Sequence, residues 1–143
     1  MSTAREKYYR LVFAISSIYD TVLGVVFAFF PRWAFNFLGI ENKLPEFRGY
    51  LTLLGAFLFV IGVAYFLIAR GDLGRNRDLV LVGTLYKLAY CVTAFGYFAA
   101  GTLPHFIFVG IFGIADLVFF VLMAECFVFL GKSPAARSAS TPA

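Results

Sequence analysis

The chain has 143 residues, of which 62% are hydrophobic and only 14% are charged, and its mean hydropathy is +0.87. Soluble domains carry about 25% charged residues, and a soluble domain of this length could not bury so much apolar surface. These values exclude a water-soluble globular domain. The formal net charge of +4 does not indicate a nucleic-acid partner, because in a membrane protein the placement of basic residues matters more than their sum.

Four apolar runs predict four transmembrane helices, at about residues 9–30, 49–69, 78–100 and 105–130. A helix needs about 20 residues to cross the hydrocarbon core, and its backbone groups must be satisfied within the segment. The first run contains Asp20 and has no small-residue cleavage site, so it is not a signal peptide. We therefore predict an all-α membrane protein, a four-transmembrane-helix bundle in a single domain over residues 1–132.

The connections between the runs carry further signals. In residues 31–49, Trp and Phe alternate with polar residues, which predicts a short interfacial segment and then a turn near Pro45. The sequence of residues 71–74 is typical of a turn, with Asp78 as the cap of the third helix. Residues 101–104 form a tight turn, so the third and fourth helices should be antiparallel neighbours.

The basic residues predict an orientation. Eight of them lie before the first helix, after the second helix or after the fourth: Arg5, Lys7, Arg10, Arg70, Arg75, Arg77, Lys132 and Arg137. The opposite side has three: Arg32, Lys43 and Arg48. The positive-inside rule then places both termini in the cytoplasm and the protein in the inner membrane. The Ala-, Ser- and Pro-rich residues 133–143 are predicted to be a disordered cytoplasmic tail.

Three ionisable residues lie deep in the predicted membrane, and such residues are functional candidates by default. Helix rise places Asp20 about 15 Å, and Lys87 and Asp116 each about 13 Å, from the inner face. Because an unpaired charge at this depth costs several kcal/mol, we expect Lys87 to bridge one or both aspartates. Helical spacing adds three polar neighbours to this intramembrane cluster: Ser16, Ser17 and Tyr90.

Three roles are open for the cluster: a structural link that fixes helix register, a proton or ion pathway or polar ligand site, and a charge that faces a partner subunit. Gly55 and Gly62, and Gly110 with Gly113, are expected at close helix contacts, with a ligand crevice as the alternative. His105 is the single histidine. It is either an interfacial residue at a helix start or a weak ligand position for a haem or chlorin.

Recognisable catalytic and metal motifs are absent from the sequence. It has no Cys-x-x-Cys, no Gly-x-Ser-x-Gly, no His-Glu-x-x-His and no P-loop. We therefore expect no catalytic residue, no metal and no resident cofactor, although contact with lipid, quinone or pigment is compatible with the apolar faces. The two cysteines, Cys91 and Cys126, should lie at different depths and remain unbonded.

Several short stretches resemble the DoxX-like group of small four-helix membrane proteins. They are Tyr19-Asp20 with Gly24 and Phe30-Pro31, Phe47-Arg48-Gly49 with Gly55, Gly62 and Tyr65, the lone Lys87, and Asp116. The resemblance covers most of the chain and implies the four-helix fold. The group has no single activity, and some members are subunits of larger membrane complexes, so the resemblance implies no catalytic residue.

The first functional hypothesis is a non-catalytic membrane subunit or accessory protein of a larger complex, with lipids, other membrane subunits or a second copy as partners. Phe-rich faces would supply the contact: Phe57, Phe59, Phe106, Phe108 and Phe119. The alternative is a small proton-coupled transporter that uses Asp20, Lys87 and Asp116. A membrane oxidoreductase is a third class, which requires a bound chromophore.

Overall fold

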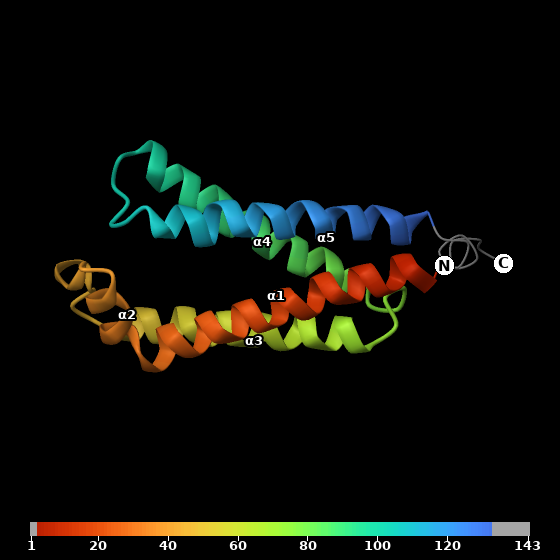
Figure 1. The fold of residues 1–143 in the computed structure, drawn as a ribbon, viewed down its shortest axis with the longest axis horizontal. Helices are drawn as coiled ribbons and strands as arrows, with labels where there is room; N and C mark the ends of the chain where they lie inside the picture. Colours follow the sequence, from red (N-terminus) through yellow and green to blue (C-terminus); the bar gives the residue numbers. More distant parts are fainter. Residues whose placement is uncertain (1–2, 133–143) are drawn as a thin grey trace.

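The computed structural model describes residues 3–132, which are all-helical and contain no strand. The α-helices are α1 (Thr3–Phe29), α2 (Pro31–Phe37), α3 (Gly49–Arg70), α4 (Arg77–Ala99) and α5 (Asp116–Gly131). A 3₁₀ turn, η1 (Glu41–Lys43), follows α2, and a π-helix, η2 (Val109–Ala115), leads directly into α5. Figure 1 shows an elongated bundle with α2 at one end, the α2 end, and the start of α1 at the other, the N-terminal end.

Four of these helical segments are long and apolar enough to cross a membrane: Ala4–Phe29, Gly49–Arg70, Arg77–Ala99 and Val109–Gly131. Each has at least 22 residues, more than the approximately 20 that a crossing requires. The predicted four-transmembrane-helix bundle is therefore confirmed. The predicted tail, residues 133–143, lies outside the described residues.

Two helix boundaries differ from the prediction. The first helix begins at Thr3, six residues before residue 9. Its polar first turns are also helical, and the guanidinium of Arg10 donates to the carboxylate of Glu6, one turn earlier, at 2.7 Å. The fourth segment does not begin at residue 105. Pro104 precedes a turn, and Nδ1 of His105 accepts the N–H of Ile107 at 3.1 Å, so that helix starts after His105.

The interfacial segment is present as α2, with Pro31 at its first position, where a missing N–H costs nothing. Trp33 and Phe37 stack with ring centroids 5.7 Å apart and are exposed, whereas Phe35 is buried. The prediction that Asp78 caps α4 is wrong. The N-cap position is Asn76, which makes no side-chain capping bond.

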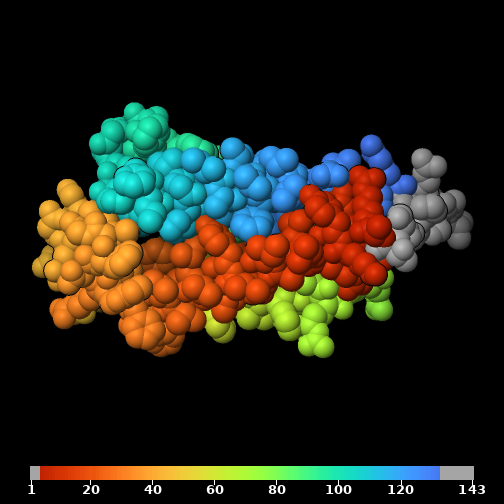
Figure 2. Space-filling model, in the orientation of Figure 1, coloured from red at the N-terminus to blue at the C-terminus, as the bar shows by residue number. Residues whose placement is uncertain are grey.

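The four long helices form two close pairs. Helix α1 packs along α3, and α4 packs along η2 and α5; Figure 1 shows the first pair below and the second above, with α4 oblique to the others. Figure 2 shows α1 and α5 side by side along one face of the molecule. The antiparallel contact between the third and fourth transmembrane helices is as predicted, while the pairing of α1 with α3 was not foreseen.

Glycines bring α1 and α3 into contact. A Cβ on Gly24 would lie 2.7 Å from the backbone nitrogen of Phe59, and one on Gly55 would lie 2.5 Å from that of Ala28. Gly62 likewise leaves no room for a side chain beside Thr21. The predicted close contacts at Gly55 and Gly62 are therefore confirmed.

On the other pair, the expectation holds for one glycine. A Cβ on Gly113 would lie 3.1 Å from the ring of Phe95. A Cβ on Gly110 would have no described atom within 4 Å apart from its chain neighbours and the backbone of its own helix. The expectation for Gly110 was wrong because helical spacing predicts the face of the helix on which a residue lies, but not which residues of another helix pack against that face.

Apolar side chains fill the bundle in two clusters, one at each end. The cluster at the N-terminal end includes Tyr9, Phe13, Tyr65, Ile68 and Met123. The cluster at the α2 end includes Phe27, Phe35, Leu58, Ala94 and Phe112. The buried charged residues Asp20, Lys87 and Asp116 belong to neither cluster.

Candidate functional site

The side chain of Lys87 connects the two helix pairs. Its Nζ lies 2.7 Å and 2.8 Å from the two carboxylate oxygens of Asp20 on α1, and 2.9 Å from Oδ1 of Asp116 at the start of α5. Lysine therefore bridges both aspartates, and all three hydrogens of its ammonium have acceptors. We call these three residues the triad.

The triad is enclosed by protein. The side chains of Lys87, Asp20 and Asp116 are 0%, 1% and 2% exposed. At this depth the attraction between opposite charges offsets their loss of hydration only when the geometry is good and the hydrogen bonds are complete. Short contacts from one ammonium to two carboxylates meet that requirement, so the triad links α1, α4 and α5.

Aromatic rings cover the ammonium. Lys87 Nζ lies 4.9 Å from the ring centroid of Tyr19, 5.2 Å from that of Phe119 and 5.6 Å from that of Tyr65, within the range of cation–π attraction. These rings were not among the candidate site residues. The signal available in the sequence was the position of Tyr19 beside Asp20 and of Phe119 one turn after Asp116.

Two of these aromatic residues also bond across helices. The hydroxyl of Tyr19 donates to the carbonyl of Ile111 at 2.9 Å, and that of Tyr65 donates to the carbonyl of Gly83 at 2.7 Å. Ile111 belongs to the π-helix η2. A π-helix bonds i to i+5 rather than i to i+4. The face of the helix on which Asp116 lies therefore differs from the face it would have after an ordinary α-helix.

The polar neighbours proposed from helical spacing divide into two groups. Ser16 belongs to the site, because its Oγ lies 3.4 Å from Oδ2 of Asp20. Ser17 instead donates to the carbonyl of Gly62 at 2.7 Å and links α1 to α3. Tyr90 shares a hydrogen bond with the hydroxyl of Tyr86 at 3.1 Å. Ser17 and Tyr90 therefore lie outside the hydrogen bonds of the triad.

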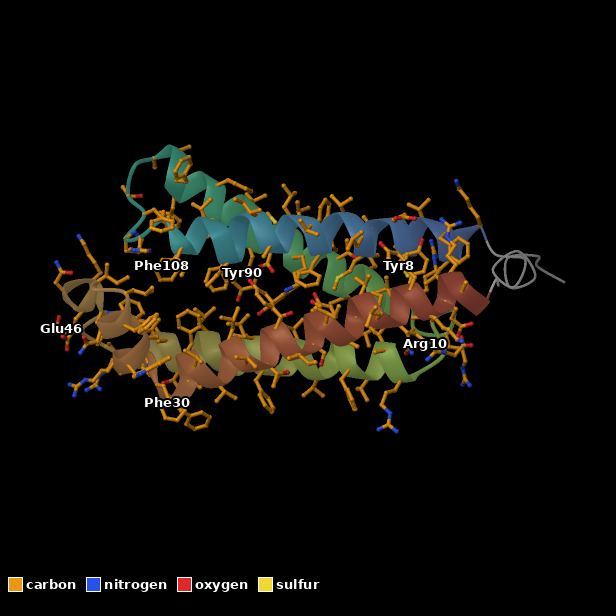
Figure 3. The ribbon with its side chains drawn as sticks, in the orientation of Figure 1. Tyr8, Arg10, Phe30, Glu46, Tyr90 and Phe108 are labelled. Atoms are coloured by element: carbon orange, nitrogen blue, oxygen red, sulfur yellow. The ribbon has the colours of Figure 1, made fainter. Side chains whose placement is uncertain are left out.

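Tyr90 belongs to a row of aromatic rings that leads from the middle of the bundle to the α2 end. Its ring stacks on Phe112 at 5.2 Å, Phe112 stacks on Phe108 at 6.2 Å, and Phe108 contacts Phe35 of α2. Figure 3 shows Tyr90 and Phe108 between the two helix pairs, with Phe108 nearer the α2 end. Phe108 and Phe119 were expected on outward-facing surfaces, but both are partly buried within the bundle.

His105 lies at the turn before η2, away from the triad. Its Nδ1 accepts the N–H of Ile107, and its ring lies 4.5 Å from that of Phe106. This geometry places His105 at a helix start. In residues 3–132 no group of three His, Cys, Asp or Glu side chains is placed to hold a metal ion, and Cys91 and Cys126 are buried and unbonded.

A second ionic contact joins α1 to α5 at the N-terminal end. Glu125 Oε1 accepts hydrogen bonds from Arg5 at 3.2 Å and from the hydroxyl of Tyr9 at 3.0 Å. The guanidinium of Arg5 also lies 4.2 Å from the ring centroid of Phe129. Because Arg5 and Glu125 are half-exposed, this contact contributes less to the stability of the bundle than the triad does.

Replacing Tyr65 by Phe should lower the free energy of unfolding by about 1 kcal/mol, because interhelical hydrogen bonds in membranes contribute about that much. The measurement is unfolding in mixed detergent micelles. Tyr97→Phe is the matched control, since Tyr97 is 58% exposed. Equal stability of the two variants would show that the bond to Gly83 contributes nothing.

Comparison with protein-family models, with curated protein sequences and with solved structures finds no match to this chain.

Proposed function

We propose that the protein is a non-catalytic small integral membrane subunit or accessory protein of a larger membrane assembly. The observation that carries this proposal is the closed triad: each deep charge has its partner inside the chain and is at most 2% exposed. A charge set used in this way stabilises the bundle, because it holds each of the three deep charged side chains in an ionic contact within the chain. What the protein offers to other molecules is its apolar surface.

That surface is large. Within an apolar window of 18 residues in each membrane span, only 28% to 39% of the residues are buried within the chain. The outward side chains of Phe57, Phe59 and Phe106 are 57%, 45% and 78% exposed. Aromatic side chains dominate the energetics of interfaces. Helices of other subunits, or lipid, would cover these faces.

The test is purification of the tagged full-length chain in a mild detergent, followed by mass spectrometry of the co-purifying chains. We expect specific membrane partners in near-stoichiometric amounts that are missing from a purification of an unrelated tagged membrane protein. A monomer that carries no other chain would contradict the proposal. The visible spectrum of the same sample tests the oxidoreductase class, which requires a chromophore.

A second candidate function, a small proton-coupled transporter, draws support from the unequal charges of the triad. One ammonium faces two carboxylates, and within residues 3–132 no hydrogen bond reaches Oδ2 of Asp116. A proton at that oxygen would balance the charge, and the triad joins two helix pairs that could move against each other.

Proton flux into proteoliposomes distinguishes the two candidates. A carrier predicts a flux above that of protein-free vesicles which is lost in Asp116→Asn and kept in Asp78→Asn, a control at the exposed start of α4. The subunit proposal predicts the same leak with and without protein. Flux that depends on Asp116 would replace the first proposal by the second.

The basic residues support an orientation with both termini in the cytoplasm and the bundle in the inner membrane, since seven of those in residues 3–132 lie at the N-terminal end and three at the α2 end. Lys43→Cys and Lys132→Cys form a matched pair at the two ends. A membrane-impermeant maleimide added to intact cells should label Cys at position 43 and not at position 132. The reverse pattern would invert the orientation.

A further inference from the structure

A hollow of about 380 Å³ lies where α1, α2 and the start of α3 meet. Its lining includes Arg32 of α2, Arg48 at the start of α3, and Trp33. Within the described residues neither guanidinium makes a hydrogen bond or an ion pair, and none of the lining residues is acidic. Figure 3 places Phe30, another lining residue, at the junction of α1 with α2. Two unpaired cations around one hollow select an anion.

A second hollow of about 350 Å³ continues from the first along the groove between α1 and α3. The two share Ala28, Phe29 and Thr52, and the second has no charged lining residue. Its floor lies where Gly24 and Gly55 bring the helices together. From Thr52 to Val60 the groove extends about 12 Å at helical rise, which fits within the roughly 15 Å of one leaflet's hydrocarbon.

We propose that these two hollows together bind one anionic phospholipid from the leaflet at the α2 end. Its phosphate lies between Arg32 and Arg48, and one acyl chain lies along the α1–α3 groove. Guanidinium groups bind phosphate oxygens in a planar, bidentate manner. The two guanidinium groups carry two positive charges, and a phosphodiester carries one negative charge. This excess of positive charge favours a headgroup with net negative charge over a zwitterionic headgroup. The attached apolar groove distinguishes a lipid from a soluble anion.

Trp33 gives a direct readout, because it lines the first hollow and is the one tryptophan of the chain. The protein is reconstituted in phosphatidylcholine vesicles that contain a small fraction of brominated phosphatidylglycerol or, in parallel, of brominated phosphatidylcholine. We expect the anionic lipid to quench Trp33 with an association constant higher by about fivefold or more, since each arginine near an anionic lipid contributes about a fivefold gain.

Substitutions separate the headgroup from the chain. Arg32→Gln with Arg48→Gln should reduce the preference for the anionic lipid to none, whereas Arg75→Gln, an exposed arginine at the other end of the bundle, should leave it unchanged. Ala56→Phe fills the groove and should weaken quenching by both brominated lipids. Because all four side chains are exposed, these variants should fold.

Three results would overturn the proposal. Equal quenching by the two brominated lipids in the unmodified protein would show no anionic preference. A preference that survives loss of both arginines would place the headgroup elsewhere. Inorganic phosphate at millimolar concentration should leave Trp33 emission unchanged in detergent, and a saturable change that needs Arg32 and Arg48 would reassign the hollow to soluble anions.

Discussion

Replacing Lys87 by Met is expected to lower the free energy of unfolding by about 3–5 kcal/mol, the cost of removing one partner from a buried ionic contact. The variant leaves the carboxylates of Asp20 and Asp116 facing each other without a cation, and both are at most 2% exposed. Methionine fills a similar volume, so the loss reports charge rather than a cavity. The measurement is the unfolding midpoint in mixed detergent micelles, read from Trp33 emission.

The matched control is Lys43→Met, which removes an exposed lysine of η1 at the α2 end. Surface substitutions of this kind change stability by about 0.5 kcal/mol or less. If Lys87→Met unfolds at the same midpoint as the control, the triad does not stabilise the fold. The structural role proposed for it would then be wrong.

Replacing Gly55 by Ala should lower the free energy of unfolding by about 1–3 kcal/mol, the usual range for overpacking. The added Cβ would lie 2.5 Å from the nitrogen of Ala28 and 2.6 Å from the carbonyl oxygen of Gly24. Both are backbone atoms, which cannot change rotamer to make room. Helices α1 and α3 must therefore move apart, and the same detergent unfolding experiment measures the loss.

Gly96→Ala tests whether the effect comes from that contact. Gly96 lies within α4, and a Cβ placed on it would have no described atom within 4 Å apart from its chain neighbours and the backbone of its own helix. Alanine is favoured over glycine in a helix by about 1 kcal/mol, so this variant should be neutral or slightly stabilising. A loss of stability equal to that of Gly55→Ala would contradict the packing of α1 against α3.

The sequence was sufficient for the spans because hydropathy maps directly onto the bilayer, where each span must satisfy its own backbone. It was also sufficient for the contacts of Lys87 with Asp20 and Asp116. Helix rise converts residue number into depth, and three charges at one depth have few partners other than each other. These two inferences depend on the membrane as a fixed frame of reference.

Contacts that depend on rotation about a helix axis could not be predicted in the same way. Ser16 and Ser17 differ by one residue, which is about 100° of rotation, and this difference turns Ser17 toward Gly62 and away from Asp20. Tyr90 shares a face of α4 with Lys87, but its hydroxyl bonds Tyr86. Spacing gives the face of a helix, and only the packing gives the partner.

The π-helix η2 was also beyond the reach of the sequence pattern. Its seven residues, Val109–Ala115, read as an ordinary apolar helix, since periodicity in a fully apolar segment is weak. Its effect is local but important for the site, because it ends immediately before Asp116. The hydroxyl of Tyr19 donates to the carbonyl of Ile111 within η2. Because Tyr19 precedes Asp20 in the sequence, this bond joins α1 to η2 next to Asp20.

The most direct test of the central claim, that the buried charges are paired with one another within the chain and stabilise the bundle, is the stability of an uncharged triad. The variant combines Asp20→Asn, Lys87→Met and Asp116→Asn, and its free energy of unfolding is compared with that of Lys87→Met alone. Because the cost of the single variant comes from unpaired charge, the triple variant should recover most of the loss. A triple variant as unstable as Lys87→Met alone would contradict the account.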